Sequence, residues 1–399
     1  MEPTTRPARV TRTNVAALTR RVIACARANA FPIALFLVLR VWTLVWASLV
    51  AAFVFPSSEA TKHYYGIEPL RDAVVAPWQR WDTIWYSKIA VEGYAADERV
   101  VFAPLYPLLM RVVSPLTGNN VVAAGLLLSS IATLASFILL YRLAREMFDE
   151  NAARRALIFL AVFPTAYFLF AAYPEALFLA LVLGAFVCAR QKHYAWAGLL
   201  GGFAALTRPQ GVLFLLPLAI EFLAQYRRNE IALRNAWTLL LVALGGIGHL
   251  LWLAFQFSSP AIWFQAQTVW HRAALPWDAL GAAWRAVIFA PSLLEAAISF
   301  MDPFFAVVFL LGIVWSARRL PLSMTAYLAT IVLPPLFVTT TYSEHYPLTA
   351  MARYVLVAFP FFLLLGALAK GWWQLPLTAF SFVVQMFYLM LFVAWVFVR

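Results

Sequence analysis

The sequence predicts an all-α protein built as a polytopic bundle of transmembrane helices. Of its 399 residues, 64% are hydrophobic and only 12% are charged, and long apolar runs recur along most of the chain. A soluble domain carries roughly a quarter charged residues, and its core does not need this much apolar sequence. The solvent for most of this chain is therefore expected to be lipid.

Apolar runs set the expected number of spans. A helix needs about 20 apolar residues to cross a bilayer, and we predict about 11 spans on this criterion. The runs lie near 31–55, 119–140, 156–172, 174–189, 195–207, 209–225, 237–257, 296–316, 321–340, 354–369 and 375–398. The first run is long enough to be kept as a membrane anchor. We therefore expect a basic cytoplasmic tail at 1–30 and a single transmembrane domain at 31–399.

The distribution of Lys and Arg predicts the orientation, because short cytoplasmic loops are enriched in them. With the N-terminus in the cytoplasm, most of the 30 basic residues fall in short inner segments, such as 142–155 and 190–192. Most acids fall outside, although acids contribute little to orientation. We therefore expect the chemistry on the outer face. The formal net charge of +12 belongs to these loops, so we do not expect nucleic acid as a partner.

The first outer loop, residues 56–118, is the longest stretch outside the predicted spans. Its segment PWQRWDTIWYSKIAVEGY (77–94) has aromatic and apolar residues at i, i+4 spacing. This pattern predicts a short amphipathic helix lying along the membrane interface. The segment VFAPLYPLLMRVVSPL (101–116) is apolar but interrupted by prolines, which predicts a surface or partly re-entrant helix.

Two acids are candidate catalytic groups. Asp82 lies between Trp81 and Thr83, and a carboxylate that loses hydration beside large aromatic rings suits a general base. An ordinary solvated loop acid is the alternative. Glu175 follows Pro174 between two apolar runs, where acids are usually functional or paired. It could equally just begin a helix, since a carboxylate is favourable at a helix N-terminus.

Several cations are predicted on the outer face. Arg208 and Arg353 interrupt the positive-inside pattern, His271 and Arg272 stand in WHR, and His345 stands in YSEH. Each alone could extend to the interface or pair with an acid, but together they favour a site for an anionic phosphate headgroup. Within the first span, Arg40 is expected to face a polar interior or pair with a buried acid.

Five blocks carry a resemblance to a known family. They are RWDTIWYSKIAVEGY (80–94), FAPLYPLLMR (102–111), FPTAYFLFAAYPEALFLAL (163–181), AGLLGGFAALTRPQGVLF (197–214) and MARYVLVAFPFF (351–362). In this order they resemble the PIG-V-type mannosyltransferases, which in eukaryotes add the second mannose during GPI-anchor synthesis. The short loops and Ala-rich tail resemble a prokaryotic member. The resemblance implies a GT-C membrane bundle that uses a lipid-phosphate sugar donor, with Asp82 as the catalytic base.

Our functional hypothesis is a multi-pass mannosyltransferase of the bacterial plasma membrane with an extracytoplasmic active site. In a eukaryotic protein the membrane would be that of the ER and the site would be luminal. The enzyme would move a hexose, first of all mannose, from a polyprenyl- or dolichyl-phosphate to a hydroxyl of an outer-face glycolipid or glycan, with inversion. The predicted catalytic residues are Asp82 and Glu175. The predicted substrate-binding residues are Arg80, Trp81, Tyr86, Arg208, His271, Arg272, His345, Arg353 and Tyr354. No cofactor is required, although Asp82 with Glu175 could hold a divalent metal.

The competing hypothesis is a membrane transporter or flippase of lipid-linked sugars. A transporter should place its essential charges near the middle of the membrane and show repeat symmetry. Here no internal repeat is evident and the charges gather at the outer rim, which favours an enzyme. A soluble nucleotide-binding domain for a sugar-nucleotide donor is not expected, because no glycine-rich dinucleotide motif stands in a usable context.

Overall fold

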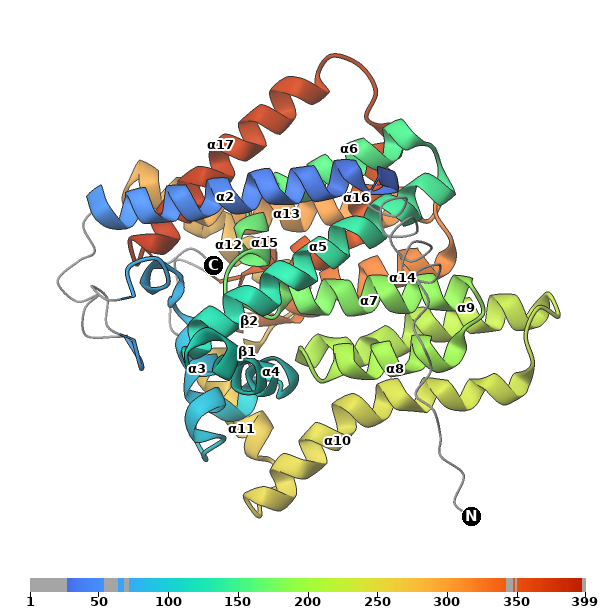
Figure 1. The fold of residues 1–399 in the computed structure, drawn as a ribbon, viewed down its shortest axis with the longest axis horizontal. Helices are drawn as coiled ribbons and strands as arrows, with labels where there is room; N and C mark the ends of the chain where they lie inside the picture. The colour runs from blue at the N-terminus through green and yellow to red at the C-terminus, as the bar shows by residue number, and fades with distance from the viewer. Residues whose placement is uncertain (1–26, 54–63, 68–71, 342–346, 349, 397–399) are drawn as a thin grey trace, which may run out of the picture.

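The computed structural model describes residues 27–53, 64–67, 72–341, 347–348 and 350–396. Across these residues the chain is helical almost throughout, which confirms the all-α prediction (Figure 1). Most of the predicted basic tail, residues 1–26, lies outside the described residues, and so does His345. The start of the first outer loop, residues 54–63, lies outside them as well.

Five helices in the described part of the chain are long and apolar enough to cross a membrane. They are α2 (Ala30–Phe53), α5 (Val121–Met147), α10 (Leu240–Gln256) with the 3-10 helix before it, α13 (Leu293–Ser316) and α17 (Gln374–Val393). A pair bent by 75° joins Met351–Val357 to α16 (Phe359–Leu368), and it makes a sixth if counted as one span. A multi-pass membrane protein is thus confirmed, while the count of about 11 spans is not.

The other predicted spans form shorter helices, of 11 to 16 residues. These are α6 (Glu150–Ala161), α7 (Glu175–Arg190), α8 (Tyr194–Ala205), α9 (Leu215–Arg227) and α14 (Leu322–Val332). The run 156–172 was wrong as one continuous helix, because α6 ends at Ala161 and Pro164 follows. Proline lacks the amide hydrogen and clashes with the preceding turn, so it interrupts a helix.

The segment 162–174 contains no α-helix, only a 3-10 helix at Ala166–Leu169, and it is buried along its whole length. Exposed backbone groups are not tolerated in lipid, so such a segment needs partners from the protein around it. Its carbonyl oxygens accept hydrogen bonds from side chains of three helices. Arg40 Nη1 donates to the Phe170 oxygen at 2.7 Å, Ser129 Oγ to Tyr173 at 3.1 Å, and Thr83 Oγ1 to Ala172 at 3.2 Å. Arg40 therefore pairs with a backbone carbonyl, where an acid had been considered.

The first outer loop contains short helices, as predicted. They are α3 (Asp82–Glu92), α4 (Leu105–Val113) and three 3-10 helices at Ala76–Trp78, Glu98–Val101 and Ser114–Thr117. Arg99 joins the loop to α3, with Nη1 at 2.7 Å from Glu92 and Nη2 at 2.8 Å from Asp97. Its hydrogen bonds hold the pKa of Asp97 below the ordinary value. This pairing fixes the end of α3 opposite to Asp82.

A two-stranded sheet interrupts the helical fold. Strand β1 (His271–Ala273) follows α11 (Ile262–Trp270) and pairs antiparallel with β2 (Val338–Thr340), with His271 opposite Thr340. After β1 the chain enters α12 (Pro276–Ile288). The all-α prediction did not include these strands. They matter because they hold His271 and Arg272 in extended backbone at one wall of the site.

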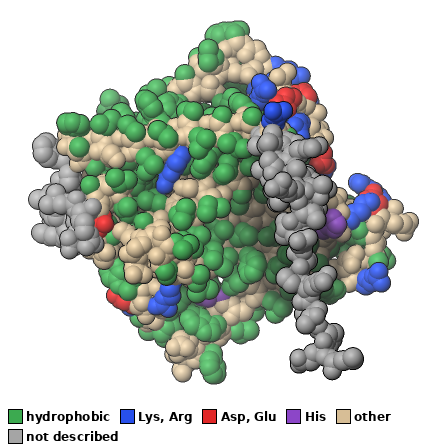
Figure 2. Space-filling model, viewed as in Figure 1, with side chains coloured by type: hydrophobic (Ala, Val, Ile, Leu, Met, Phe, Trp, Pro, Cys, Tyr) green, Lys and Arg blue, Asp and Glu red, His purple; other side chains and the backbone are tan. Residues whose placement is uncertain are grey.

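The basic segments predicted to be inner gather at one end of the molecule. In Figure 2 most Lys and Arg side chains visible in this view lie toward the right edge, where α5, α7 and α9 end in Figure 1, while the middle is hydrophobic. Ion pairs link these loops to one another: Arg190 Nη2 lies 2.9 Å from Glu146, and Lys192 Nζ lies 3.4 Å from Glu230. Their common location agrees with alternating spans.

Helices α8 and α10 cross closely through glycines. A Cβ atom on Gly245 would overlap the carbonyl oxygen of Gly202, and one on Gly202 would lie 2.7 Å from the Leu241 oxygen. Close approach of small residues is how helices pack tightly in a membrane, where the hydrophobic effect does not drive helix association. Gly248, on the same helix α10, faces open space.

We expect Gly245→Ala to destabilise the folded protein by about 1–3 kcal/mol, because the added methyl group forces the two backbones apart. Thermal unfolding of the purified protein in detergent measures the change as a lower Tm. Gly248→Ala is the matched control, with no loss expected. Equal Tm values for the two variants would contradict the close crossing.

We expect the basic end to face the cytoplasm and the first outer loop to face away from it. Cysteines placed at Ala96 and at Arg228, both exposed, report on the two ends in a variant with Cys25 and Cys188 replaced by serine. A membrane-impermeant maleimide should label Ala96→Cys in intact cells and Arg228→Cys only after permeabilisation. The reverse pattern would invert the predicted orientation.

Candidate active site

Asp82 opens helix α3 from a strained backbone position. Trp81, immediately before it, has φ 52° and ψ −116°, a conformation that bulky residues rarely adopt. Such a conformation costs on the order of 1–3 kcal/mol and persists only where the surroundings impose it. Here the Tyr173 hydroxyl donates to the Arg80 carbonyl at 2.9 Å, and Thr83 Oγ1 donates to the Ala172 carbonyl. The buried segment 162–174 therefore anchors the turn that presents Asp82.

Two acids and two arginines form one chain of ion pairs. Arg353 Nη1 lies 2.6 Å from Asp82 Oδ2, and Arg353 Nε lies 2.5 Å from Glu175 Oε1. The same Glu175 oxygen lies 3.1 Å from Arg208 Nη1. The Glu175 side chain is 0% exposed, whereas that of Asp82 is 30% exposed. Asp82 is thus the accessible end of this series of ion pairs, and Glu175 lies at its buried centre.

Aromatic rings hold the two guanidinium groups in place. Arg353 Cζ lies 4.6 Å from the ring centroid of Tyr173 and 5.0 Å from that of Phe168. Arg208 Cζ lies 5.3 Å from the ring centroid of Tyr354. Stacking on a ring face restricts a planar guanidinium, so both cations are pre-oriented.

The short helix α15 (Met351–Tyr354), which carries Arg353, is held from two sides. The carboxylate of Asp302 in α13 accepts from the Ala352 amide at 2.8 Å, and Thr165 Oγ1 donates to the Ala352 carbonyl at 2.8 Å. Ala350, just before the helix, has a positive φ of 53°. Arg353 is therefore positioned by packed, bonded backbone rather than by a free loop.

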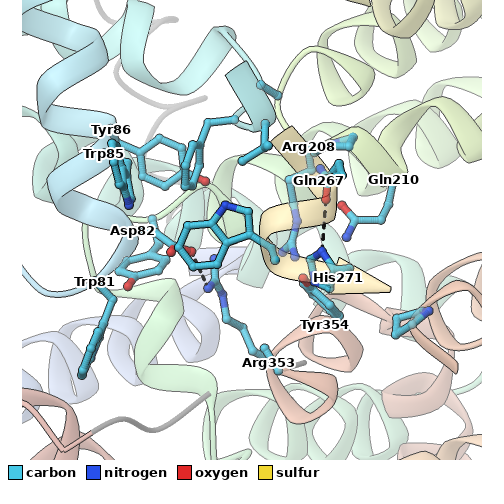
Figure 3. Close-up of a pocket in the computed structure, with 18 of the residues that line it drawn as sticks. Trp81, Asp82, Trp85, Tyr86, Arg208, Gln210, Gln267, His271, Arg353 and Tyr354 are labelled. Carbon is cyan, nitrogen blue, oxygen red and sulfur yellow. Dashed lines mark hydrogen bonds and ion pairs between the residues drawn. The ribbon is translucent and has the colours of Figure 1, made fainter. Parts of the chain in front are cut away.

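Asp82, Arg208 and Arg353 border a cavity of about 1430 Å³. Figure 3 shows Asp82 and Arg353 on one side and His271 with Gln267 across from them, and His271 Nδ1 lies 3.1 Å from Gln267 Oε1. Aromatic residues of several segments line the wall, among them Trp85 of the first loop and Trp263 of α11. A carboxylate, several cations and aromatic faces thus share one space.

Most of the predicted site residues line this cavity. They are Trp81, Asp82, Tyr86, Arg208, His271, Arg272, Arg353 and Tyr354. Burial raises the pKa of the Tyr86 phenol, and the Asp82 carboxylate adds to this, so Tyr86 stays neutral. Two predicted residues do not line it. Glu175 lies behind the arginines, and Arg80 is buried with Nε donating to the Val393 carbonyl at 3.0 Å. His345 lies outside the described residues.

Asp82 and Glu175 had been left open as metal ligands. The guanidinium of Arg353 lies between them and bonds to both carboxylates, so a protein cation occupies the position where they could share an ion. Among the described residues, no group of three or more His, Cys, Asp or Glu side chains is arranged to hold a metal. The charge of the two acids is compensated by arginine in this arrangement.

Several cavity residues escaped the sequence analysis. They include Tyr64, Trp85, Lys88, Phe102, Gln210, Gln267 and Trp395. A signal existed for Trp85 and Lys88, which share the helical face of Asp82 at i, i+3 spacing. Gln267 lies one helical turn before His271. No local pattern indicated Trp395, because it reaches the site from the far end of the chain.

Comparison with known proteins places these observations in a family context. Residues 102–252 match the family described as dolichyl-phosphate-mannose-protein mannosyltransferase. This range includes Glu175 and Arg208 but not Asp82 or Arg353. GPI mannosyltransferase 2 of two strains of Cryptococcus neoformans var. neoformans serotype D is 25% identical over 147 residues. The aligned part spans 34% of this chain and only 34% of the length of these curated relatives.

Among solved structures, the chain is similar to the oligosaccharyltransferase of Archaeoglobus fulgidus. The form tethered to an acceptor peptide gives a TM-score of 0.43 at 14% identity, covering 90% of this chain and 56% of that one. The apo form gives 0.41 at 12% identity, covering 89% and 56%. Likeness at this level assigns neither a fold nor an activity.

The two sequence comparisons agree with each other, and the family match covers three of the five blocks described above, 102–111, 163–181 and 197–214. The matching family and the matching relatives are both named as mannosyltransferases. Over these parts of its length, the chain is therefore similar to mannosyltransferases.

Proposed function

We propose that this protein transfers a hexose, first of all mannose, from a polyprenyl- or dolichyl-phosphate to a hydroxyl of a glycolipid or glycan, with inversion at the anomeric carbon. One observation carries the proposal. A partly exposed carboxylate, Asp82, borders a large cavity, while a second, buried carboxylate holds two arginines beside it. This is the arrangement that transfer from a phosphate ester to an alcohol requires.

Asp82 acts as the general base. Its carboxylate takes the proton of the acceptor hydroxyl while the acceptor oxygen forms a bond to the anomeric carbon. The bond from that carbon to the phosphate oxygen breaks at the same time, and the lipid phosphate leaves with the electron pair. The sugar passes through an oxocarbenium-like state, as in other glycosyl transfers. Since a phosphate is a good leaving group, no general acid is needed.

Arg353 and Arg208 stabilise the negative charge that develops on the phosphate. Among the described residues, the ion pairs of Arg353 engage Nε and Nη1, so Nη2 can donate to a phosphate oxygen. Arg208 lines the cavity with its side chain 7% exposed. Preorganised cations in a site with little water stabilise a transition state more strongly than they would in bulk solvent. Glu175 acts through them, as the acid that positions both arginines.

The wall opposite Asp82 receives the rest of the substrates. His271 and Arg272 on β1 add donors for the phosphate or the acceptor, and the Trp263 ring offers a flat face for a sugar ring. On the side of Asp82, the Trp85 ring offers a second flat face. The partners are then the lipid-linked donor, the glycolipid or glycan acceptor, and the bilayer. We place the site on the extracytoplasmic face of a bacterial plasma membrane, because the basic loops gather at the other end of the molecule.

We expect Asp82→Asn to fold normally and to lose about 10²- to 10⁴-fold in kcat, since the acceptor proton then has no base. The assay follows sugar transfer from radiolabelled polyprenyl-phosphate mannose by purified protein in nanodiscs, with a lipid and glycan extract as acceptor. Glu98→Gln is the control, as an acid of the same loop that does not line the cavity.

Full turnover in Asp82→Asn would remove Asp82 as the base. If wild-type protein transfers no sugar, the same nanodiscs are tested for flipping of the lipid-linked sugar, which distinguishes the transporter hypothesis.

We expect Arg208→Gln to raise the KM for the lipid-phosphate donor and to lower kcat, because a phosphate oxygen loses a charged partner. Removal of one charge-assisted donor should cost at least about tenfold in kcat/KM. Steady-state transfer at varied donor concentration measures both constants. Arg111→Gln is the control, since Arg111 donates to the Val91 carbonyl and is exposed. A change only in the acceptor KM would reassign Arg208 to the acceptor.

A further inference from the structure

The end of helix α17 reaches the wall of the active-site cavity. Ala394 and Trp395 follow the last helical residue, Val393, and Trp395 lines the cavity beside Trp81. We propose that Trp395, together with Arg80, positions Asp82 for the reaction, so that the C-terminal segment is a working part of the active site. This inference rests on the proposed function, in which Asp82 is the base.

Arg80 links the first loop to the end of α17. Its Nε donates to the Val393 carbonyl at 3.0 Å across 313 positions of sequence, and its Nη1 donates to the Ala76 carbonyl at 2.6 Å. The guanidinium also lies against the Trp395 ring, with Cζ 4.6 Å from the ring centroid. Arg80 is fully buried, and its guanidinium donates to backbone carbonyls of both the first loop and α17. It therefore links these two segments. It does not reach the cavity, so its role is positioning.

Trp395 in turn supports Trp81. Their ring centroids lie 5.5 Å apart at an interplanar angle of 66°, the edge-to-face geometry that aromatic pairs favour. Both residues have a positive φ, 52° for Trp81 and 61° for Trp395. Such backbone persists only when the contacts around it impose it. The ring contact is therefore one of the contacts, beside the hydrogen bonds of Tyr173 and Thr83, that hold Trp81 in a conformation it does not prefer by itself.

The strained turn at Trp81 decides where Asp82 points. The Thr83 amide bonds the Arg80 carbonyl at 3.1 Å, and the Ile84 amide bonds the Trp81 carbonyl at 3.0 Å, so the first turn of α3 is built on these two residues. If the Trp81 ring loses its support, the turn can relax toward ordinary dihedral angles. Asp82 would then move relative to Arg353, while the remainder of α3 stays anchored by Arg99.

The experiment compares Trp395→Ala, Trp395→Leu and Trp395→Phe with wild type in nanodiscs. Trp372→Ala is the matched control, because Trp372 lies just before α17 at its opposite end and is 85% exposed. Two readouts are taken: hydrogen exchange of the amides of residues 80–92, and the kinetic constants of sugar transfer. Exchange reports on the turn whether or not the protein transfers sugar.

The proposal predicts faster exchange at Thr83 and Ile84 in Trp395→Ala, and a loss in kcat approaching about a hundredfold, as expected when a reacting group is misplaced by about 1 Å. The donor KM should change little, since the arginines are untouched. Trp395→Phe keeps an aromatic ring and should recover most of the kcat. Trp395→Leu keeps apolar bulk without a ring and should not. Trp372→Ala should match wild type in both readouts.

Unchanged exchange in a folded Trp395→Ala variant would overturn the proposal, as would equal behaviour of the Trp372→Ala control. If Trp395→Ala does not fold, the Phe and Leu variants decide, and equal exchange and kcat in those two would overturn it. If wild type transfers no sugar from any donor, the proposed function fails separately, while the exchange data still test the coupling of Trp395 to the first turn of α3.

Discussion

The charge of one fully buried carboxylate, Glu175, constrains the rest of the site. An ionised acid in the protein interior costs several kcal/mol in lost hydration unless cations compensate it. Arg353 and Arg208 approach the same carboxylate oxygen, and they come from segments far apart in the chain. Satisfying Glu175 therefore draws α7, the turn before α9 and α15 to one point. Because Arg353 also reaches Asp82, the same requirement aligns the accessible acid with the two cations.

Glu175 itself depends on an irregular segment at membrane depth. Residues 162–174 contain only a 3-10 helix and are buried, and three of their carbonyls accept hydrogen bonds from Arg40, Thr83 and Ser129. Such backbone is stable in a membrane only when protein groups replace the missing helical hydrogen bonds. The segment is held in place by these bonds. It leads into α7, whose first residue is Glu175, and it anchors the turn before Asp82. The side chains that donate to its carbonyl oxygens therefore also stabilise the active site.

The sequence predicted the membrane class, an outer gathering of polar residues and a set of site residues most of which line the cavity, because composition, charge asymmetry and ordered blocks are properties of the chain itself. It grouped Arg208 and Arg353 among the cations of one anion site, and it named Asp82 separately as the candidate base. It overestimated the continuity of the apolar run 156–172, since hydropathy measures polarity and not whether Pro164 breaks the helix. The strands at 271–273 and 338–340 were missed, because three residues are too few for a period-two pattern to be seen.

The role of each residue in the site depends on how far its side chain is buried and on which groups it contacts. The sequence by itself determined that acids and cations would meet at one face of a membrane bundle, since residue type and sidedness follow from local composition. Only the tertiary structure decided that Glu175 lies behind the arginines, that Arg80 binds the Val393 carbonyl, and that Trp395 supports Trp81. These contacts join residues separated by up to 314 positions, from Trp81 to Trp395, and such contacts depend on how all the helices pack together.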